Sequence, residues 1–446
     1  MFPRILIANR GEIAVRVIRA CKEMGISTVA VFSEADRNAL HVSLADESIC
    51  IGPAQVGKSY LNMTAILSAA VATGVNAIHP GYGLLSENEQ FARLCEKCSI
   101  KFIGPSADVI AAMGDKDNAR HTMRAAGVPV IPGCDLVPDA ATAEAEAAKI
   151  GFPLLIKARA GGGGRGIRRV YAMEEVAPAF EAASAEARAA FGDGEVYMEK
   201  LLTNVHHVEV QLLCDQYGKV VCLGERECSI QRRNQKLIEE CPSPSVTPEL
   251  REKLYDAARR AAVAAHYEGV GTVEFLLDQD GGFYFMEMNT RLQVEHPVTE
   301  LVTRIDLVKW QIRVAAGMAL PFDQGDISLD GSAIECRINA EDPGQNFRPS
   351  CGRIELLHVP GGPSVRFDTA LYQGYEVPPF YDSLIAKLIV HAHTRQEAIR
   401  KMEAALCEMV VEGVEHTGDL QLELIRSQGF ADGDYTTAFF ETNYPI

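Results

Sequence analysis

Apolar runs alternate with helix-period stretches through the first third of the chain. Residues 4–8 and 28–32 are short apolar runs typical of buried strands, and residues 11–24 carry an apolar stripe at helical spacing. Strands that alternate with helices favour an open α/β sheet. The turn at residues 9–12 reads Asn-Arg-Gly-Glu and lacks the GxGxxG pattern, so a dinucleotide-binding fold has little support.

The pattern changes further along the chain. A segment rich in Ala, Glu and Asp follows at about 133–148, and from Pro153 the pattern of strands and hairpins predicts a mixed α+β core that ends near residue 330. The last part predicts strands near 333–339 and 354–358. It ends with a helix that opens on a Thr-x-x-Glu capping box at residues 394–397.

Composition excludes several classes of function. The 446 residues carry 43 Lys and Arg against 60 Asp and Glu, a net charge of −17, which disfavours general binding to nucleic acid or anionic lipid. A local cationic pocket for a small anionic substrate stays open. No apolar run is long enough for a membrane span, and no secretory segment is evident, so we expect a cytoplasmic protein without disulfides.

A glycine loop lies between two predicted strands. The loop includes Gly162, Gly163 and Gly164, whose backbone N–H groups can close over phosphate oxygens, and Lys157 can supply a point charge. No helix follows the loop, so it predicts a lid rather than a P-loop. A flexible hairpin tip is the structural alternative.

A second segment resembles a P-loop only in its letters. Residues 52–59 match the Walker A pattern, but three residues separate them from a helix expected near Thr64, and no Walker B strand is obvious. We therefore do not expect a working P-loop here.

The strongest chemical signal is a hairpin with facing carboxylates. Asp280-Gly281 predicts a two-residue type I′ turn, and the register that it sets places Glu274 opposite Glu287. Two facing carboxylates repel unless a cation lies between them, and Asn289 shares their face. These hard oxygen ligands suit Mg²⁺ bound to nucleotide phosphates. A solvated edge strand with incidental charges is the alternative.

Further polar residues point to the same place. The polar row continues at every second position through Arg291, Gln293 and Glu295, which is costly on a buried face unless it forms a site. Residues 231–236 form a cationic loop. His207 and Glu209 alternate on a strand, and because this pair lacks a third zinc ligand, a hydrogen bond to a ribose is favoured.

The lid, the lysine and the carboxylate hairpin together make the ATP-grasp arrangement, and residues 4 to about 435 resemble the biotin carboxylase family. The matching blocks are residues 7–13, 79–83, 113–116, 197–200, 287–291, 293–300, 335–342 and 381–383. Carbamoyl phosphate synthetase shares the hairpin but not the full set. The resemblance implies an α/β N-terminal domain (1–113), an ATP-grasp domain (114–330, with a lid at about 132–203) and a mixed β C-terminal domain (331–446).

The resemblance also implies a set of substrate contacts. ATP would lie between the lid and the hairpin. Its phosphates would meet Lys116, Lys157 and the loop glycines, its adenine Glu199, Lys200 and Leu202, and its ribose end His207, Gln231 and Asn234. Two Mg²⁺ or Mn²⁺ ions would be held by Glu274, Glu287 and Asn289. Bicarbonate would be clasped by Lys236, Arg291, Gln293, the Val294 backbone and Glu295.

The implied reaction is the carboxylation of biotin. Glu295 resembles the general base that deprotonates bicarbonate for attack on the γ-phosphate, which gives carboxyphosphate and then CO₂ and phosphate. Arg337 would stabilise the biotin enolate, and Tyr82 would lie on the biotin side. The lid sequence at 158–160 and Asn234 depart from many family members without putting activity in question.

Partners also follow from the resemblance. Biotin reaches such enzymes on a carrier lysine within Met-Lys-Met, a string that this chain lacks, so we expect the biotin carboxyl carrier protein and carboxyltransferase elsewhere. Arg19, Glu23 and Arg366 match the family's homodimer interface. The final acceptor stays open among acetyl-CoA, propionyl-CoA, pyruvate and urea. The rival interpretations are another ATP-grasp carboxylate ligase and a nucleotide-binding regulatory subunit without turnover.

Overall fold

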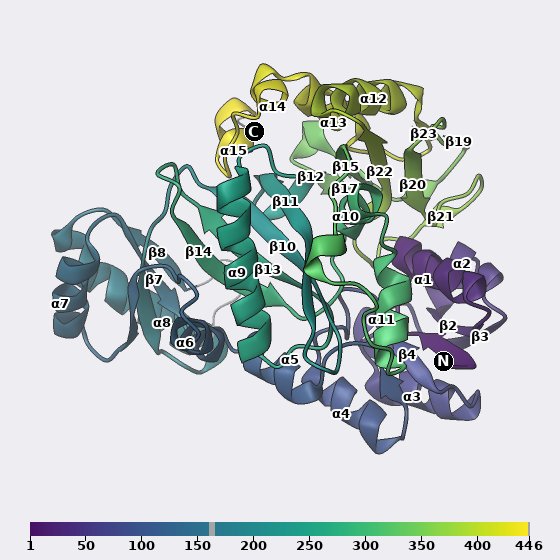
Figure 1. Cartoon of the computed structure of the whole chain (residues 1–446), viewed down its shortest axis with the longest axis horizontal. Coiled ribbons are helices and arrows are strands. Elements are labelled where there is room, and N and C mark those ends of the chain that lie inside the picture. The colour runs from purple at the N-terminus through teal and green to yellow at the C-terminus, as the bar shows by residue number, and fades with distance from the viewer. Residues whose placement is uncertain (160–165, 445–446) are drawn as a thin grey trace.

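Three large β-sheets organise the molecule, and the computed structural model describes them over residues 1–159 and 166–444 (Figure 1). The first is a parallel five-stranded sheet in the order β3-β2-β1-β4-β5. Its strands are β1 (Arg4–Ile7), β2 (Ser27–Ser33), β3 (Glu47–Gly52), β4 (Ala77–His79) and β5 (Lys101–Phe102). Its helices are α1 (Gly11–Glu23), α2 (Leu40–Leu44), α3 (Met63–Ala72), α4 (Glu89–Lys97) and α5 (Ala107–Gly114). The predicted open α/β sheet is confirmed.

The second sheet has eight strands and lies at the centre of the molecule (Figure 1). Its order is β14-β13-β10-β11-β12-β15-β22-β20. The strands are β10 (His206–Cys214), β11 (Val220–Arg232), β12 (Gln235–Cys241), β13 (Gly269–Leu277), β14 (Phe283–Asn289), β15 (Ser332–Asn339), β20 (Val365–Thr369) and β22 (Leu384–Ala392). Because β12 pairs with β15, with Glu239 opposite Glu335, one continuous sheet crosses the boundary predicted at residue 330. Side chains from both predicted domains therefore share one surface.

The lid is a separate four-stranded sheet at the left of Figure 1, in the order β6-β9-β7-β8. Its strands are β6 (Gly133–Val137), β7 (Leu154–Ala158), β8 (Ile167–Val170) and β9 (Val196–Lys200), and α7 (Ala140–Ile150) and α8 (Val176–Phe191) share their apolar core. The strands predicted on both sides of the glycine loop are confirmed. Gly162, Gly163 and Gly164 lie outside the described residues.

The remaining elements pack around these sheets. The helices are α6 (Lys116–Ala125), α9 (Pro248–Ala264), α10 (His296–Thr303), α11 (Leu307–Ala315), α12 (Arg395–Glu408), α13 (Gly418–Arg426), α14 (Gln428–Asp432) and α15 (Phe439–Asn443). The short strand pairs are β16 (Glu341–Asp342) with β17 (Arg348–Pro349), β18 (Gly352–Arg353) with β21 (Glu376–Val377), and β19 (Leu356–His358) with β23 (Val410–Glu412). The capping box predicted at 394–397 is present at the start of α12. Among the described residues, none of the helices combines the length and apolar character needed to cross a bilayer.

The β13–β14 hairpin confirms one prediction and corrects another. Glu274 does face Glu287. The connection, however, is a longer loop, because the Asp278 carboxylate accepts hydrogen bonds from the N–H groups of Asp280 at 3.0 Å and Gly282 at 2.7 Å. The two-residue type I′ turn is therefore wrong. A bulge after Glu274 adds one residue to β14 and restores the predicted register.

A buried ion pair ties the C-terminal helices to the central sheet. Arg395, the first residue of α12, donates to both carboxylate oxygens of Glu240 on β12, at 2.7 and 2.9 Å. It also donates to the backbone carbonyls of Phe430 and Ala431 at 2.7 and 2.9 Å. Because Glu240 is fully buried, its charge depends on this arginine.

We expect Arg395→Met to lower the free energy of unfolding by about 3 kcal/mol, because it leaves the buried Glu240 carboxylate with the Tyr435 hydroxyl but without a cation. Arg426→Met is the matched control, since the pair of Arg426 with Glu403 is exposed and should contribute less than about 1 kcal/mol. Urea unfolding followed by circular dichroism measures both. Equal losses in the two variants would show that the buried pair has no special role.

Candidate active site

An open cavity of about 1680 Å³ lies between the lid, the β13–β14 hairpin and the N-terminal sheet. Among the described residues, every predicted site residue lines it except Lys200. The Lys200 ammonium instead donates to the backbone carbonyl of Phe152 at 2.6 Å, within the lid. Residues of the lid, of the β13–β14 hairpin and of the C-terminal strand β15 thus line one cavity, as the motifs predicted.

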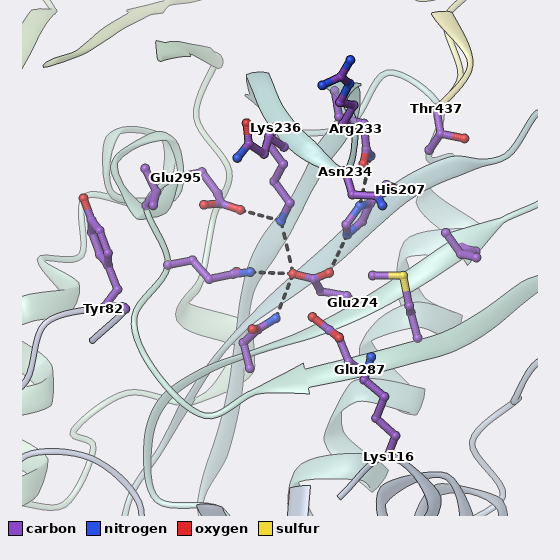
Figure 2. Close-up of a pocket in the computed structure, with 18 of the residues that line it drawn as sticks. Tyr82, Lys116, His207, Arg233, Asn234, Lys236, Glu274, Glu287, Glu295 and Thr437 are labelled. Atoms are coloured by element: carbon purple, nitrogen blue, oxygen red, sulfur yellow. Dashed lines mark hydrogen bonds and ion pairs between the residues drawn. The ribbon is translucent and has the colours of Figure 1, made fainter. Parts of the chain in front are cut away.

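Lys236 is the electrostatic centre of this cavity (Figure 2). Its ammonium lies 2.6 Å from a carboxylate oxygen of Glu209, 2.6 Å from Glu295 and 3.2 Å from Glu274. Glu209 lies on β10, Glu274 lies on β13, and Glu295 is the N-cap residue of α10. Burial by itself would lower the pKa of Lys236, but the surrounding acidic groups raise it well above its usual value. The lysine therefore stays charged and holds the three acids together.

Glu295 carries a charge that two cations stabilise. Its Oε1 accepts from Lys236 at 2.6 Å, and its Oε2 accepts from Arg337 at 3.0 Å. Burial would raise the pKa of Glu295, yet Lys236 and Arg337 together hold it well below its usual range. Glu295 is thus a carboxylate able to accept a proton.

The predicted metal ligands lie together on the hairpin. The Oε1 of Glu274 accepts from Asn289 Nδ2 at 2.8 Å and from Gln293 Nε2 at 2.7 Å, and the His207 ring lies 2.7 Å from Oε2. Burial, and then the charge of Glu274, raises the pKa of Glu287. Two carboxylates and an amide oxygen on one face fit a divalent cation such as Mg²⁺, which would relieve this repulsion.

Glu274 is a third neighbour of the His207 and Glu209 pair that the sequence analysis did not expect. His207, Glu209 and Glu274 bring ligand atoms within 4.8 Å of one another, because β10 pairs with β13 so that Glu209 faces Glu274. The predicted lack of a third ligand beside His207 and Glu209 is therefore wrong. Lys236 and Arg226 already balance the two carboxylates, so this group serves the charge network.

Arg226 is a site residue that the sequence analysis missed. It is fully buried on β11 and donates to Glu209 at 2.6 Å and to Gln293 Oε1 at 2.6 Å. It also donates to Gln211 at 2.6 Å and to Thr299 at 2.9 Å. The available signal was a run of three charges, Glu225 to Glu227, between the apolar stretches of β11, since buried charges need partners.

Arg337 lies on β15 beside a second missed residue, Glu239. Its Nε donates to Glu239 Oε1 at 2.6 Å. Burial raises the pKa of Glu239 to about 7, although Arg337 opposes the shift. Arg291 lies next to the metal-ligand candidates on the hairpin. It donates to Glu87 at 2.8 Å and to Asn289 Oδ1 at 3.1 Å. Fixed guanidinium groups thus flank Glu295 and the hairpin.

The lid side of the cavity carries its own ion pairs. The Lys157 ammonium lies 2.6 Å from Glu199, and the Arg120 guanidinium lies 3.6 Å from the same carboxylate. Lys116 begins α6 and points toward Glu287 in Figure 2. Lys116 and Lys157 thus both line the lid side of the cavity.

The loop between β11 and β12 carries Asn234. Its backbone has positive φ at Arg233 and Asn234, 49° and 64°.

Comparison with known proteins identifies the family. Models of the biotin carboxylase N-terminal domain (residues 1–110), of the carbamoyl-phosphate synthase L chain ATP binding domain (115–322) and of the biotin carboxylase C-terminal domain (335–442) match in turn. Biotin carboxylase 1 of Bacillus subtilis is 54% identical over 99% of both chains. The chain belongs to the biotin carboxylase family.

Solved structures agree with this assignment to the biotin carboxylases. A Campylobacter jejuni biotin carboxylase, described as a β,γ-ATP complex, matches with a TM-score of 0.94 and 48% identity over 99% of both chains. The biotin carboxylase domain of a Hydrogenobacter thermophilus 2-oxoglutarate carboxylase, a dimer with MgADP, ADP and bicarbonate, matches with a TM-score of 0.92 and 51% identity. That match covers 99% of this chain and 98% of the other. The predicted ATP-grasp fold and ATP-dependent ligase class are confirmed.

Relatives of this biotin carboxylase serve different carboxylases. A pyruvate carboxylase subunit of Methanothermobacter thermautotrophicus is 53% identical, over 99% of this chain and 90% of the relative. Similarity at this level therefore accompanies more than one final acceptor.

We expect Glu287→Gln to raise the Mg²⁺ concentration that half-saturates ATP turnover by at least about tenfold, because it removes a hard anionic ligand beside Glu274. Asp280→Asn is the matched control, since that carboxylate lies on the exposed end of the same hairpin. Magnesium titrations of ADP release measure both. An unchanged magnesium dependence in Glu287→Gln would contradict the metal assignment.

Proposed function

We propose that this biotin carboxylase uses the residues of this cavity to form carboxyphosphate from ATP and bicarbonate and to transfer the carboxyl group to N1′ of biotin. The observation that carries the proposal is the position of Lys236. It bridges Glu274 of the hairpin and Glu295 of the adjoining turn, and so joins the nucleotide end of the cavity to the bicarbonate end.

The nucleotide is proposed to bind between the lid and the hairpin. Lys116 and Lys157 approach from the lid side and can neutralise phosphate charge. Since Lys157 pairs with Glu199, phosphate binding exchanges one anionic partner of the lysine for another. Glu274, Glu287 and Asn289 would hold Mg²⁺, which neutralises charge on the phosphates when bound.

Bicarbonate is proposed to bind next to Lys236, Arg291 and Gln293, with Glu295 as its base. The low pKa of Glu295 depends on Lys236 and Arg337. A bicarbonate anion draws these cations toward itself, so the pKa of Glu295 moves back toward its usual value and the carboxylate becomes a better base. Glu295 then takes the bicarbonate proton as a bicarbonate oxygen attacks the γ-phosphorus and ADP leaves.

Biotin is proposed to bind on the side of Arg337 and Tyr82. Carboxyphosphate breaks its C–O bond to phosphate and releases CO₂, and the phosphate takes the N1′ proton of biotin. The ureido oxygen then carries negative charge, and the half-buried Arg337 guanidinium, held by Glu239, is a fixed cation that stabilises it. The biotin nitrogen attacks CO₂ to form carboxybiotin.

The partners are proposed from the family. A biotin carboxyl carrier protein would deliver biotin, and a carboxyltransferase would pass the carboxyl group on, for example to acetyl-CoA in fatty acid synthesis. A homodimer is supported by a related dimeric structure and by Arg19 and Glu23, which lie exposed on α1. Arg366 contributes to the same face, where it pairs with Glu300 at 2.7 Å.

We expect Arg337→Ala to lower biotin carboxylation by about 100- to 1000-fold, because the enolate loses its fixed cation, while the affinity for ATP stays nearly unchanged. The measurement compares carboxybiotin formation from free biotin with ATP binding by calorimetry. Arg304→Ala is the control, because this arginine is exposed and does not line the cavity.

Equal losses of ATP binding and carboxylation in Arg337→Ala would show that the role given to Arg337 is wrong. Tight ATP binding by the unaltered protein with no bicarbonate-dependent turnover would favour a regulatory subunit. Turnover with another carboxylate and none with biotin would favour a different ATP-grasp ligase.

A further inference from the structure

Lys387 is a fully buried lysine that the proposed mechanism does not use. It lies on β22 directly opposite Arg337 on β15, and its side chain is 0% exposed. Side chains of directly opposed residues in antiparallel strands share one face. Two cations therefore lie side by side, which is costly unless each has partners of its own.

The partners of Lys387 come from two other parts of the chain. Its Nζ donates to the backbone carbonyl of Val294 at 2.7 Å and lies 3.3 Å from Glu12 Oε1 on α1. The Tyr82 hydroxyl donates to the same Glu12 oxygen, and the lysine lies 5.9 Å from the centre of the Tyr82 ring. A single ammonium thus joins the N-terminal sheet region, the turn before α10 and the C-terminal strands.

The hydrogen bond from Lys387 to the Val294 carbonyl bears on the position of Glu295. This carbonyl belongs to the peptide unit that links Val294 to Glu295, and a peptide unit is planar and rigid. Holding its oxygen therefore fixes the direction in which the Glu295 side chain leaves the turn. Arg337 holds the other end of the same residue, at 3.0 Å from Glu295 Oε2.

We infer that Lys387 is a positioning residue for Glu295: it fixes the Val294–Glu295 peptide while the neighbouring Arg337 fixes the carboxylate. This inference rests on the proposed role of Glu295 as the base. Lys387 is absent from the residues that line the cavity, so it acts through the peptide and not on a substrate. Loss of the lysine lets the carboxylate shift relative to bicarbonate.

The effect should be confined to the bicarbonate step. A displacement of about 1 Å at a reacting group can cost about 100-fold in rate. The residues proposed for ATP phosphates, Lys116 and Lys157, lie on the lid side and share no contact with Lys387 in the described part of the chain. A lysine that merely joined domains would instead change both substrates' parameters together.

The test measures bicarbonate-dependent ADP release without biotin, using the full chain. We expect Lys387→Met to lower kcat/KM for bicarbonate by about 10- to 100-fold and to leave KM for ATP within about twofold. The double variant Glu12→Gln/Lys387→Met removes both members of the buried pair, which protects the fold, and should show the same bicarbonate defect. The single variant Glu12→Gln keeps the lysine–carbonyl bond and should change kcat/KM for bicarbonate by less than about threefold.

Two results would overturn the inference. One is a folded double variant whose kcat/KM for bicarbonate stays within about threefold of the unaltered protein. The other is an equal loss in the parameters for ATP and for bicarbonate, which indicates a structural role only. Absence of bicarbonate-dependent ADP release in the unaltered protein is a different failure, because it contradicts the proposed function itself.

Discussion

One buried ammonium, that of Lys236, permits three carboxylates to share the centre of this protein. Without it, the nearly fully buried carboxylates of Glu209, Glu274 and Glu295 would repel one another. Two arginines add to this charge balance: Arg226 donates to Glu209, and Arg337 donates to Glu295. The arrangement is costly in desolvation energy. It keeps the proposed base Glu295 charged, the proposed metal ligands anionic and two cations close to the proposed bicarbonate position.

The continuous central sheet makes this balance possible. Because β12 pairs with β15, the C-terminal strands bring Arg337 and Lys387 to the edge of the ATP-grasp core. The turn between β14 and α10 then runs between these cations and Lys236. A boundary between independent domains at residue 330 would leave the two halves of the site free to move apart. The sheet holds them in register through backbone hydrogen bonds.

Local patterns predicted much of the site. The register taken from the expected turn placed Glu274 opposite Glu287, and this held only because the bulge in β14 offsets the longer loop. The resemblance of the motif blocks gave Lys236, Arg291 and Arg337. The predicted hairpin turn was wrong because the Asp278 carboxylate accepts hydrogen bonds from backbone N–H groups of the loop and stabilises a longer connection. A dipeptide preference such as Asp-Gly does not reveal this side-chain contact. Arg226, Glu239 and Lys387 were missed because their roles depend on which strands lie side by side. Only Lys387 is a lone charge within an apolar strand; Arg226 and Glu239 have charged neighbours in the sequence.

The fate of the bicarbonate oxygens tests the central claim most directly, because the claim is that Glu295 directs bicarbonate, and not water, to the γ-phosphorus. Freshly prepared ¹⁸O-bicarbonate would be mixed with Mg-ATP, free biotin and the full chain, and the phosphate would be examined by mass spectrometry at early times. The account predicts one labelled oxygen in each phosphate formed. Phosphate without label would mean attack by water and would contradict the assignment of this site to carboxyphosphate formation.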